Sequence, residues 1–220
     1  MENYTGASKD SPIWEFNYKP DRYIHKSWLA TVPNGDLLEK LRSNKRDTTP
    51  LSQYLLSQLG FNGEFYFDFS DNPLAKVALL PSDSLEKLVK AIGATYNYQE
   101  ISQVISKPEV SLLKTILGND LYGFAFQQAP LIARKKLSQL NYPHTTKLHE
   151  KIISTGIFCL HSAFRHQPPA LRKRLLIKLP KEWFNISQNY TKSPSEKVFS
   201  ESECIYVTHK VAKLIKKETR

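Results

Sequence analysis

Long apolar runs are missing from this chain of 220 residues. None approaches the roughly 20 consecutive apolar residues that a membrane-spanning helix needs. The first twelve residues, MENYTGASKDSP, also lack the basic start and the apolar stretch of a signal peptide. These absences predict a soluble cytoplasmic protein. Residues 1–12 are expected to be disordered, because the stretch is polar and rich in turn-forming residues.

Cysteines and catalytic motifs are equally scarce. The chain has two cysteines, Cys159 and Cys204, and neither belongs to a CxxC pair, so both are interpreted as reduced core residues. The sequence contains no GxGxxG, GxxxxGKS, GxxxxGKT, HExxH or GxSxG pattern. We therefore expect no catalytic residues, no metal and no cofactor, which leaves an enzyme of unfamiliar type as the alternative. His25 is interpreted as a structural histidine that forms a hydrogen bond.

Amphipathic helices account for most of what the sequence does contain. The clearest lies in VALLPSDSLEKLVKAIG, Val77–Gly93, where Pro81 and Ser82 indicate a helix start and the final glycine indicates its end. Leucine, valine and isoleucine then recur at helical spacing, so this helix is expected to pack in the core. Similar patterns predict helices over Gly35–Ser43, Leu51–Leu59, Tyr98–Ile105, Pro108–Leu117, Lys147–Phe164 and Ser202–Lys217, and one between Pro168 or Pro169 and Pro180.

Lys147–Phe164 is the longest helix with a broad apolar face that the sequence predicts. In its middle stand three small residues, Ser154, Thr155 and Gly156. Small side chains leave room for a neighbouring backbone, so a second helix is expected to approach closely at this point.

One stretch departs from the helical pattern. In GEFYFDFSDNP, Phe65, Phe67 and Phe69 alternate with other residues, as in a strand. Because a single short strand leaves its edges unpaired, the stretch is expected either to form a small hairpin with Lys76–Leu80 or to lie extended on the helices. The prediction is therefore a mainly α fold: one compact multi-helix domain over residues 13–220, with at most a short β-hairpin or extended segment near residues 64–80 and a loop near residues 185–201.

Positive charge is concentrated in the last quarter of the chain. The whole sequence has a formal net charge of +10, and residues 165–220 hold 13 Lys and Arg against 5 Asp and Glu. Such a surface favours an acidic partner, which could be a protein, an anionic lipid surface or a nucleic acid. In the helix after Pro168 and Pro169 the leucines are expected to face inward and the cations outward. The candidate partner-binding residues are Arg172, Lys173, Arg174, Lys178, Lys210 and Lys213.

Several segments, taken in order, resemble a known family. FNYKPDRYIHKSWL is similar to the N-terminal F, P, YIH, L pattern of the SctK proteins of bacterial type III secretion systems, the group that includes YscK, OrgA and MxiK. ALLPSDSLEKLVKAIG resembles the LP-helix-LG segment of that family. ISTGIFCLHSAFRHQPPALRKRLLIKLP resembles its long helix followed by an R-L-x-L-x-LP segment, and HKVAKLIK resembles its last helix. The order and spacing agree over about 200 residues, and the second half is closer to the YscK branch.

The resemblance implies a largely helical, non-enzymatic adaptor of the type III secretion sorting platform. In that family the protein joins the cytosolic domain of the inner-membrane ring protein SctD to pods built from SctQ. SctL in turn connects the pods to the ATPase. The implied location is the cytosolic face of the inner membrane. The Lys-rich C-terminus and the stretch Asn185–Glu201 depart from the family pattern, so partner contacts are not transferred residue by residue.

A nucleic-acid-binding helical protein is the alternative from another class, because the last quarter of the chain is basic. Specific nucleic-acid binding usually adds a reader helix or stacking aromatics among the basic residues. Neither pattern accompanies Arg172–Lys178 or the lysines that follow Lys210. The adaptor interpretation is therefore favoured.

Overall fold

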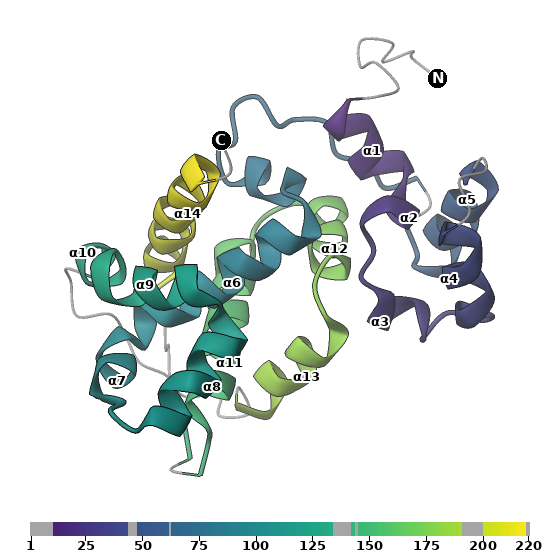
Figure 1. The fold of residues 1–220 in the computed structure, drawn as a ribbon. Helices are drawn as coiled ribbons and strands as arrows, with labels where there is room; N and C mark the ends of the chain where they lie inside the picture. Colours follow the sequence, from purple (N-terminus) through teal and green to yellow (C-terminus); the bar gives the residue numbers. More distant parts are fainter. Residues whose placement is uncertain are drawn as a thin grey trace. The chain divides into compact units, whose positions relative to one another are not determined.

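The computed structural model describes residues 11–43, 48–61, 63–133, 142–143, 145–190 and 200–218. These residues form α-helices and one 3-10 helix, with no β-strand among them, so the predicted mainly α class is confirmed (Figure 1). By its contacts the chain divides into two compact units, which we call unit 1 (Met1–Ser82 and Gln167–Lys181) and unit 2 (Asp83–His166 and Glu182–Arg220). That residues 13–220 fold as one domain stays a prediction. The expected disorder of residues 1–12 falls outside the described residues, except at Ser11 and Pro12.

Unit 1 is built from short helices whose starts are visible in the sequence. Its elements are α1 (Pro12–Tyr18), α2 (Pro20–Tyr23), α3 (Lys26–Leu29), α4 (Gly35–Ser43), α5 (Thr49–Gln58), the 3-10 helix η1 (Ala75–Leu79) and α12 (Pro169–Ile177). The Ser11 hydroxyl caps α1 by accepting a hydrogen bond from the N–H of Trp14 at 3.2 Å. Proline stands in the first turn of α1, α2, α5 and α12, where its missing N–H costs no hydrogen bond.

The core of unit 1 joins segments that lie far apart in the sequence. Its buried members are Tyr23, Ile24, Leu29, Val32, Leu38, Leu51, Leu55, Phe61 and Ile177. Two hydrogen bonds link residues 167–181 to the N-terminal helices of unit 1. Trp28 Nε1 donates to the carbonyl of Leu179 at 2.8 Å, and the N–H of His25 donates to the carbonyl of Ile177 at 2.8 Å. Residues 167–181 therefore complete a fold that the first 82 residues begin.

The phenylalanine-rich stretch forms neither a strand nor a helix, and the N–H of Phe69 donates to the carbonyl of Phe67 at 3.0 Å in a tight turn. Of the two alternatives for this stretch, a hairpin with Lys76–Leu80 is wrong, because residues 75–79 form η1. Asn17, at the end of α1, takes the place of a neighbouring strand. Its side chain donates to the carbonyl of Tyr66 at 2.7 Å and accepts from the N–H of the same residue at 2.9 Å. These two bonds satisfy the N–H and the carbonyl of Tyr66, which in a hairpin would bond to a neighbouring strand.

Unit 2 is organised around two helices that cross in direct backbone contact. Its elements are α6 (Ser82–Tyr96), α7 (Tyr98–Gln103), α8 (Lys107–Leu117), α9 (Asn119–Gln127), α10 (Ala129–Ile132), α11 (Leu148–Ala163), α13 (Lys181–Tyr190) and α14 (Glu201–Glu218). A Cβ placed on Gly93 would overlap the carbonyl of Ile152 in α11, and a Cβ on Gly156 would overlap the carbonyl of Val89 in α6. The close approach predicted at Gly156 is therefore confirmed. The predicted helix end at Gly93 is wrong, because this glycine serves the crossing and α6 continues to Tyr96.

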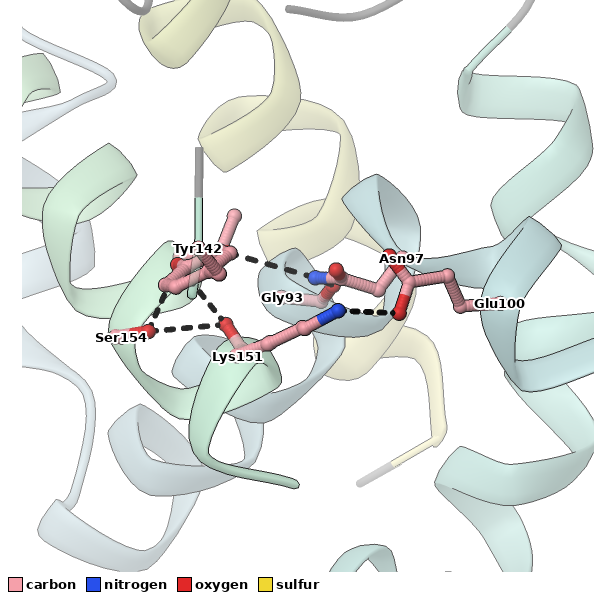
Figure 2. A network of polar contacts seen from close by, with 7 residues as sticks. Gly93, Asn97, Glu100, Tyr142, Lys151 and Ser154 are labelled. Carbon is pink, nitrogen blue, oxygen red and sulfur yellow. Dashed lines mark hydrogen bonds and ion pairs between the residues drawn. The ribbon is translucent and has the colours of Figure 1, made fainter. Parts of the chain in front are cut away.

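A polar network follows the crossing and links α6, α7 and α11 to Tyr142 (Figure 2). The Tyr142 hydroxyl lies 2.8 Å from Ser154 Oγ and 2.7 Å from Thr155 Oγ1. The side-chain amide of Asn97 donates to the carbonyl of Gly93, in the last turn of α6, at 2.8 Å. Lys151 and Glu100 form an ion pair at 2.9 Å that joins α11 to α7. The predicted small residues thus serve both packing and hydrogen bonding.

The terminal helix packs on α11 and brings the two cysteines together. Cys159 and Cys204 are free and buried, which confirms their predicted place in the core. Cys159 Sγ lies 3.7 Å from the Tyr96 hydroxyl and 3.8 Å from the carbonyl of Cys204. Burial raises the pKa of the Cys159 thiol, so at neutral pH it stays protonated.

The predicted loop over residues 185–201 is partly wrong. Helix α13 runs to Tyr190, so its second half occupies the beginning of that stretch. Residues 191–199 lie outside the described residues. Trp183, in the first turn of α13, is buried. The sequence from Asn185 onward is rich in polar residues, so composition alone predicted a loop there. Within the part of the chain that the structure describes, no helix has the length and apolar character needed to cross a bilayer.

Candidate partner-binding surface

The six cations predicted to bind a partner do not share one exposed face. Lys173, Lys210 and Lys213 are exposed, and Arg172 is half-buried. Arg174 and Lys178 are 0% and 4% exposed, so their predicted outward orientation is wrong. Both lie on the same side of α12 as Leu171, three and seven residues further along the helix. The helical period therefore takes them into the core in spite of their charge.

Arg174 fills the space between α12 and α1. Its guanidinium donates to the carbonyls of Ala170 and Asn17, each at 3.3 Å. It also lies 4.9 Å from the ring centroid of Phe61 and 5.9 Å from that of Phe65, within the range of a cation–π contact. Its neighbours are thus carbonyl oxygens and ring faces, which all favour a positive charge.

Lys178 is buried in unit 1, where its side chain caps the C-terminal end of η1. Its ammonium donates to the carbonyls of Ala78 at 2.7 Å and Leu80 at 3.1 Å, which are buried acceptors where η1 ends. The rings of Phe16 and Tyr23 lie 5.2 Å and 4.8 Å from Nζ. Burial lowers the pKa of Lys178 to about 7, with a small opposing effect from Glu15.

The pKa of Lys178 predicts a pH-dependent stability. Between about pH 7 and the unfolded pKa of about 10.4, the unfolded chain binds one proton more than the folded chain at this position. The contribution of Lys178 to the free energy of unfolding should therefore rise with pH, by at most about 1.4 kcal/mol per pH unit. We expect wild type to gain stability relative to Lys178→Met when urea unfolding is compared at pH 7, 8 and 9. If the free energies of unfolding of the two proteins differed by the same amount at all three pH values, this pKa would be contradicted.

Four aromatic rings form a continuous surface on unit 1. Tyr18 lies at its centre, with ring centroids 5.5 Å from Trp14, 4.9 Å from Phe65 and 6.5 Å from Phe67. Phe65 and Phe67 are 40% and 39% exposed, whereas Phe69, from the same stretch, is buried. We call Trp14, Tyr18, Phe65 and Phe67 the aromatic surface.

The aromatic surface is held in place by buried polar contacts. Asn17 fixes the backbone of Tyr66, between the two exposed phenylalanines, and Arg174 lies against the ring of Phe65 from inside. Lys173, which precedes Arg174 in α12, forms an ion pair with Glu64 at 3.0 Å. Residues predicted to bind a partner thus support this surface instead of forming it. The sequence carried a signal for it, since Trp14 and Tyr18 are one helical turn apart and Phe65 and Phe67 alternate with other residues.

The remaining predicted residues have plain structural surroundings. His25 caps α3, and its Nδ1 accepts a hydrogen bond from the N–H of Ser27 at 3.3 Å, which confirms its predicted hydrogen-bonding role. Lys210 lies 5.7 Å from the ring centroid of Tyr206 on the exposed side of α14. Over the described ranges, no three His, Cys, Asp or Glu side chains are grouped as metal ligands would be.

Comparisons with known proteins give one family and one fold. Residues 12–219 match the family model described as YOP proteins translocation protein K (YscK). The chain is also similar to a solved structure, the cytoplasmic domain of the T3SS sorting platform protein PscK from P. aeruginosa, with a TM-score of 0.57 and 20% sequence identity over 94% of this chain and 95% of that one. No curated protein sequence is significantly similar to the chain.

Proposed function

Because this chain belongs to the YscK family, we propose that it is a non-enzymatic adaptor of a type III secretion sorting platform. The observation that carries the proposal is the family match, which spans nearly the whole chain from residue 12 to residue 219. The fold shared with a protein described as a sorting platform component supports it. The place of action would be the cytoplasm, at the cytosolic face of the inner membrane.

The proposed task is to join the cytosolic domain of the SctD-type ring protein to the SctQ-type pods, with SctL as a further candidate contact. An adaptor of this kind needs two separate surfaces, and each unit of the chain offers one. Unit 1 has the aromatic surface, and unit 2 has exposed apolar side chains at Leu112, Phe126 and Leu131. Lys210 and Lys213 add exposed positive charge on unit 2, which favours an acidic protein surface.

The adaptor proposal predicts bridging between two partners. When the cytosolic domain of the cognate SctD-type protein is immobilised, the purified SctQ-type protein should be retained only after this chain is added. Each partner should also bind the chain alone, as measured by calorimetry. Retention of the pod protein without this chain, or failure of the chain to bind either partner, would overturn the proposal.

Electrostatic attraction to a partner should depend on Lys210 and Lys213. Their replacement by Glu should leave the unfolding curve nearly unchanged, because exposed charges contribute little to stability. It should slow association at low salt more than at physiological salt. Salt-dependent binding of short duplex or single-stranded oligonucleotides by the wild-type chain, without binding of the secretion proteins, would favour the alternative of a nucleic-acid-binding protein.

A further inference from the structure

The aromatic surface has the features of a binding site for an extended peptide. We propose that Trp14, Tyr18, Phe65 and Phe67 bind a proline-containing segment of a partner protein in the polyproline II conformation, with a basic residue beside the prolines. Three independent observations lead to this partner: the exposed rings, two hydrogen-bond donors among them, and the charges around them.

The first observation is the contiguity of the rings. Each of the other three rings lies within 6.5 Å of Tyr18 between centroids, and Phe65 and Phe67 are themselves 6.2 Å apart. The surface draws on α1 and on an irregular stretch almost 50 residues later in the chain, and the contacts of Asn17 hold the two together. Neighbouring aromatic side chains of this kind pack well against proline rings, which lose little conformational freedom on binding.

The second observation separates an extended peptide from a helix. In the part of the chain that is described, neither the indole N–H of Trp14 nor the hydroxyl of Tyr18 has a hydrogen-bond partner, and neither atom is buried. A bound helix would offer few acceptors, since its carbonyls are used in its own backbone hydrogen bonds. A polyproline II segment forms no internal hydrogen bonds, so its carbonyls are available to both donors.

The third observation is the local charge. Residues 64–71 contain Glu64, Asp68 and Asp71 and no Lys or Arg, within a protein whose net charge is +10. Glu64 is paired with Lys173, whereas Asp68 and Asp71 are exposed and have no partner among the described residues. Lys19 Nζ lies 5.9 Å from the ring centroid of Trp14, so the surface is acidic only at its phenylalanine end. That end is complementary to a basic residue in the bound segment.

Fluorescence anisotropy with a defined peptide tests the proposal. The probe is a fluorescein-labelled peptide with two Pro-Pro pairs around a leucine and an arginine at each end. The full chain should bind this probe saturably. Phe67→Ser should weaken binding at least tenfold, and Tyr18→Phe, which removes only the hydroxyl, should weaken it several-fold. Asp68→Asn should reduce binding at low salt more than at high salt.

Matched controls make the outcome specific. Leu37 is 55% exposed on α4 of unit 1, so Leu37→Ser removes another exposed apolar side chain outside the aromatic surface and should leave probe affinity unchanged. A probe with every proline replaced by glycine should bind at least tenfold more weakly, because it must be ordered on binding. Thermal melts of each variant establish that it is folded.

Three results would overturn the proposal. They are absence of saturable binding to the wild-type chain, equal weakening by Phe67→Ser and Leu37→Ser, and a dimer of the wild-type chain that Phe67→Ser dissociates in sedimentation experiments. The last result would assign the aromatic surface to a second copy of the chain. The probe contains no secretion protein, so its failure to bind would leave the bridging experiment unaffected.

Discussion

Gly93→Ala is expected to lower the free energy of unfolding by roughly 2–4 kcal/mol. The new methyl group would overlap the backbone carbonyl of Ile152, so α6 and α11 would have to move apart. A flexible side chain could turn away from such a contact, but a helix backbone cannot. Alanine is the better helix former by about 1 kcal/mol, and this gain is smaller than the cost of opening the crossing. Urea unfolding followed by circular dichroism measures the difference.

Gly123→Ala is the matched control for this substitution. Gly123 also lies within a helix, α9, but a Cβ there would meet nothing within 4 Å. Its replacement should therefore raise stability by about 0.5–1 kcal/mol through helix propensity alone. Gly156→Ala should resemble Gly93→Ala, because a Cβ there would overlap the carbonyl of Val89. Equal effects at Gly93 and Gly123 would show that the two helices are not in backbone contact.

Arg174→Glu is expected to destabilise the protein by about 3–5 kcal/mol. The carboxylate would face the carbonyls of Ala170 and Asn17 and the rings of Phe61 and Phe65, which now contact a cation. Because the position is fully buried, water cannot screen this repulsion. Guanidinium chloride would screen charges in this experiment, so urea unfolding is the suitable measurement.

Two further variants separate charge from packing at α12. Arg174→Met keeps most of the side-chain volume without a charge, so it should cost only about 1 kcal/mol. Lys173→Glu changes the adjacent residue, whose side chain is exposed and paired with Glu64, and should cost less than about 1 kcal/mol. If Arg174→Glu and Lys173→Glu unfolded at the same urea concentration, the placement of the Arg174 side chain in the core would be contradicted.

Helix type and approximate position were readable from the sequence because they depend on local signals. Gly35–Ser43 was predicted with the bounds that the structure has, and Gly118 ends α8 in the left-handed region, with φ 83°, as a helix-terminating glycine does. The positions of Cys159 and Cys204 followed from their place on apolar helix faces. Each of these features needs only the residues within a few turns of it.

Errors arose where a local signal had two tertiary meanings. Gly93 could end a helix or admit a neighbouring backbone, and only the position of Ile152 decides between them. Pro168 and Pro169 correctly indicated the start of α12. The prediction of which residues face the solvent relied on their charge, whereas the helical period places Arg174 and Lys178 on the buried side. Arg174 and Lys178 are buried because rings and unpaired carbonyls from other segments surround them. Those partners come from residues about 100 to 157 positions away in the chain.

By itself the sequence determined the family, the helical class and the residues able to form each helix, since these depend on pattern and order along the chain. The sequence pairs Trp14 with Tyr18 and Phe65 with Phe67, but only the tertiary structure joins the two pairs into the aromatic surface. Trp14 and Tyr18 lie on one helix and Phe65 and Phe67 on an irregular stretch, and nothing local to either requires them to meet. They meet where the buried side chain of Asn17 donates to the carbonyl of Tyr66 and accepts from the N–H of the same residue, which satisfies polar groups on both segments.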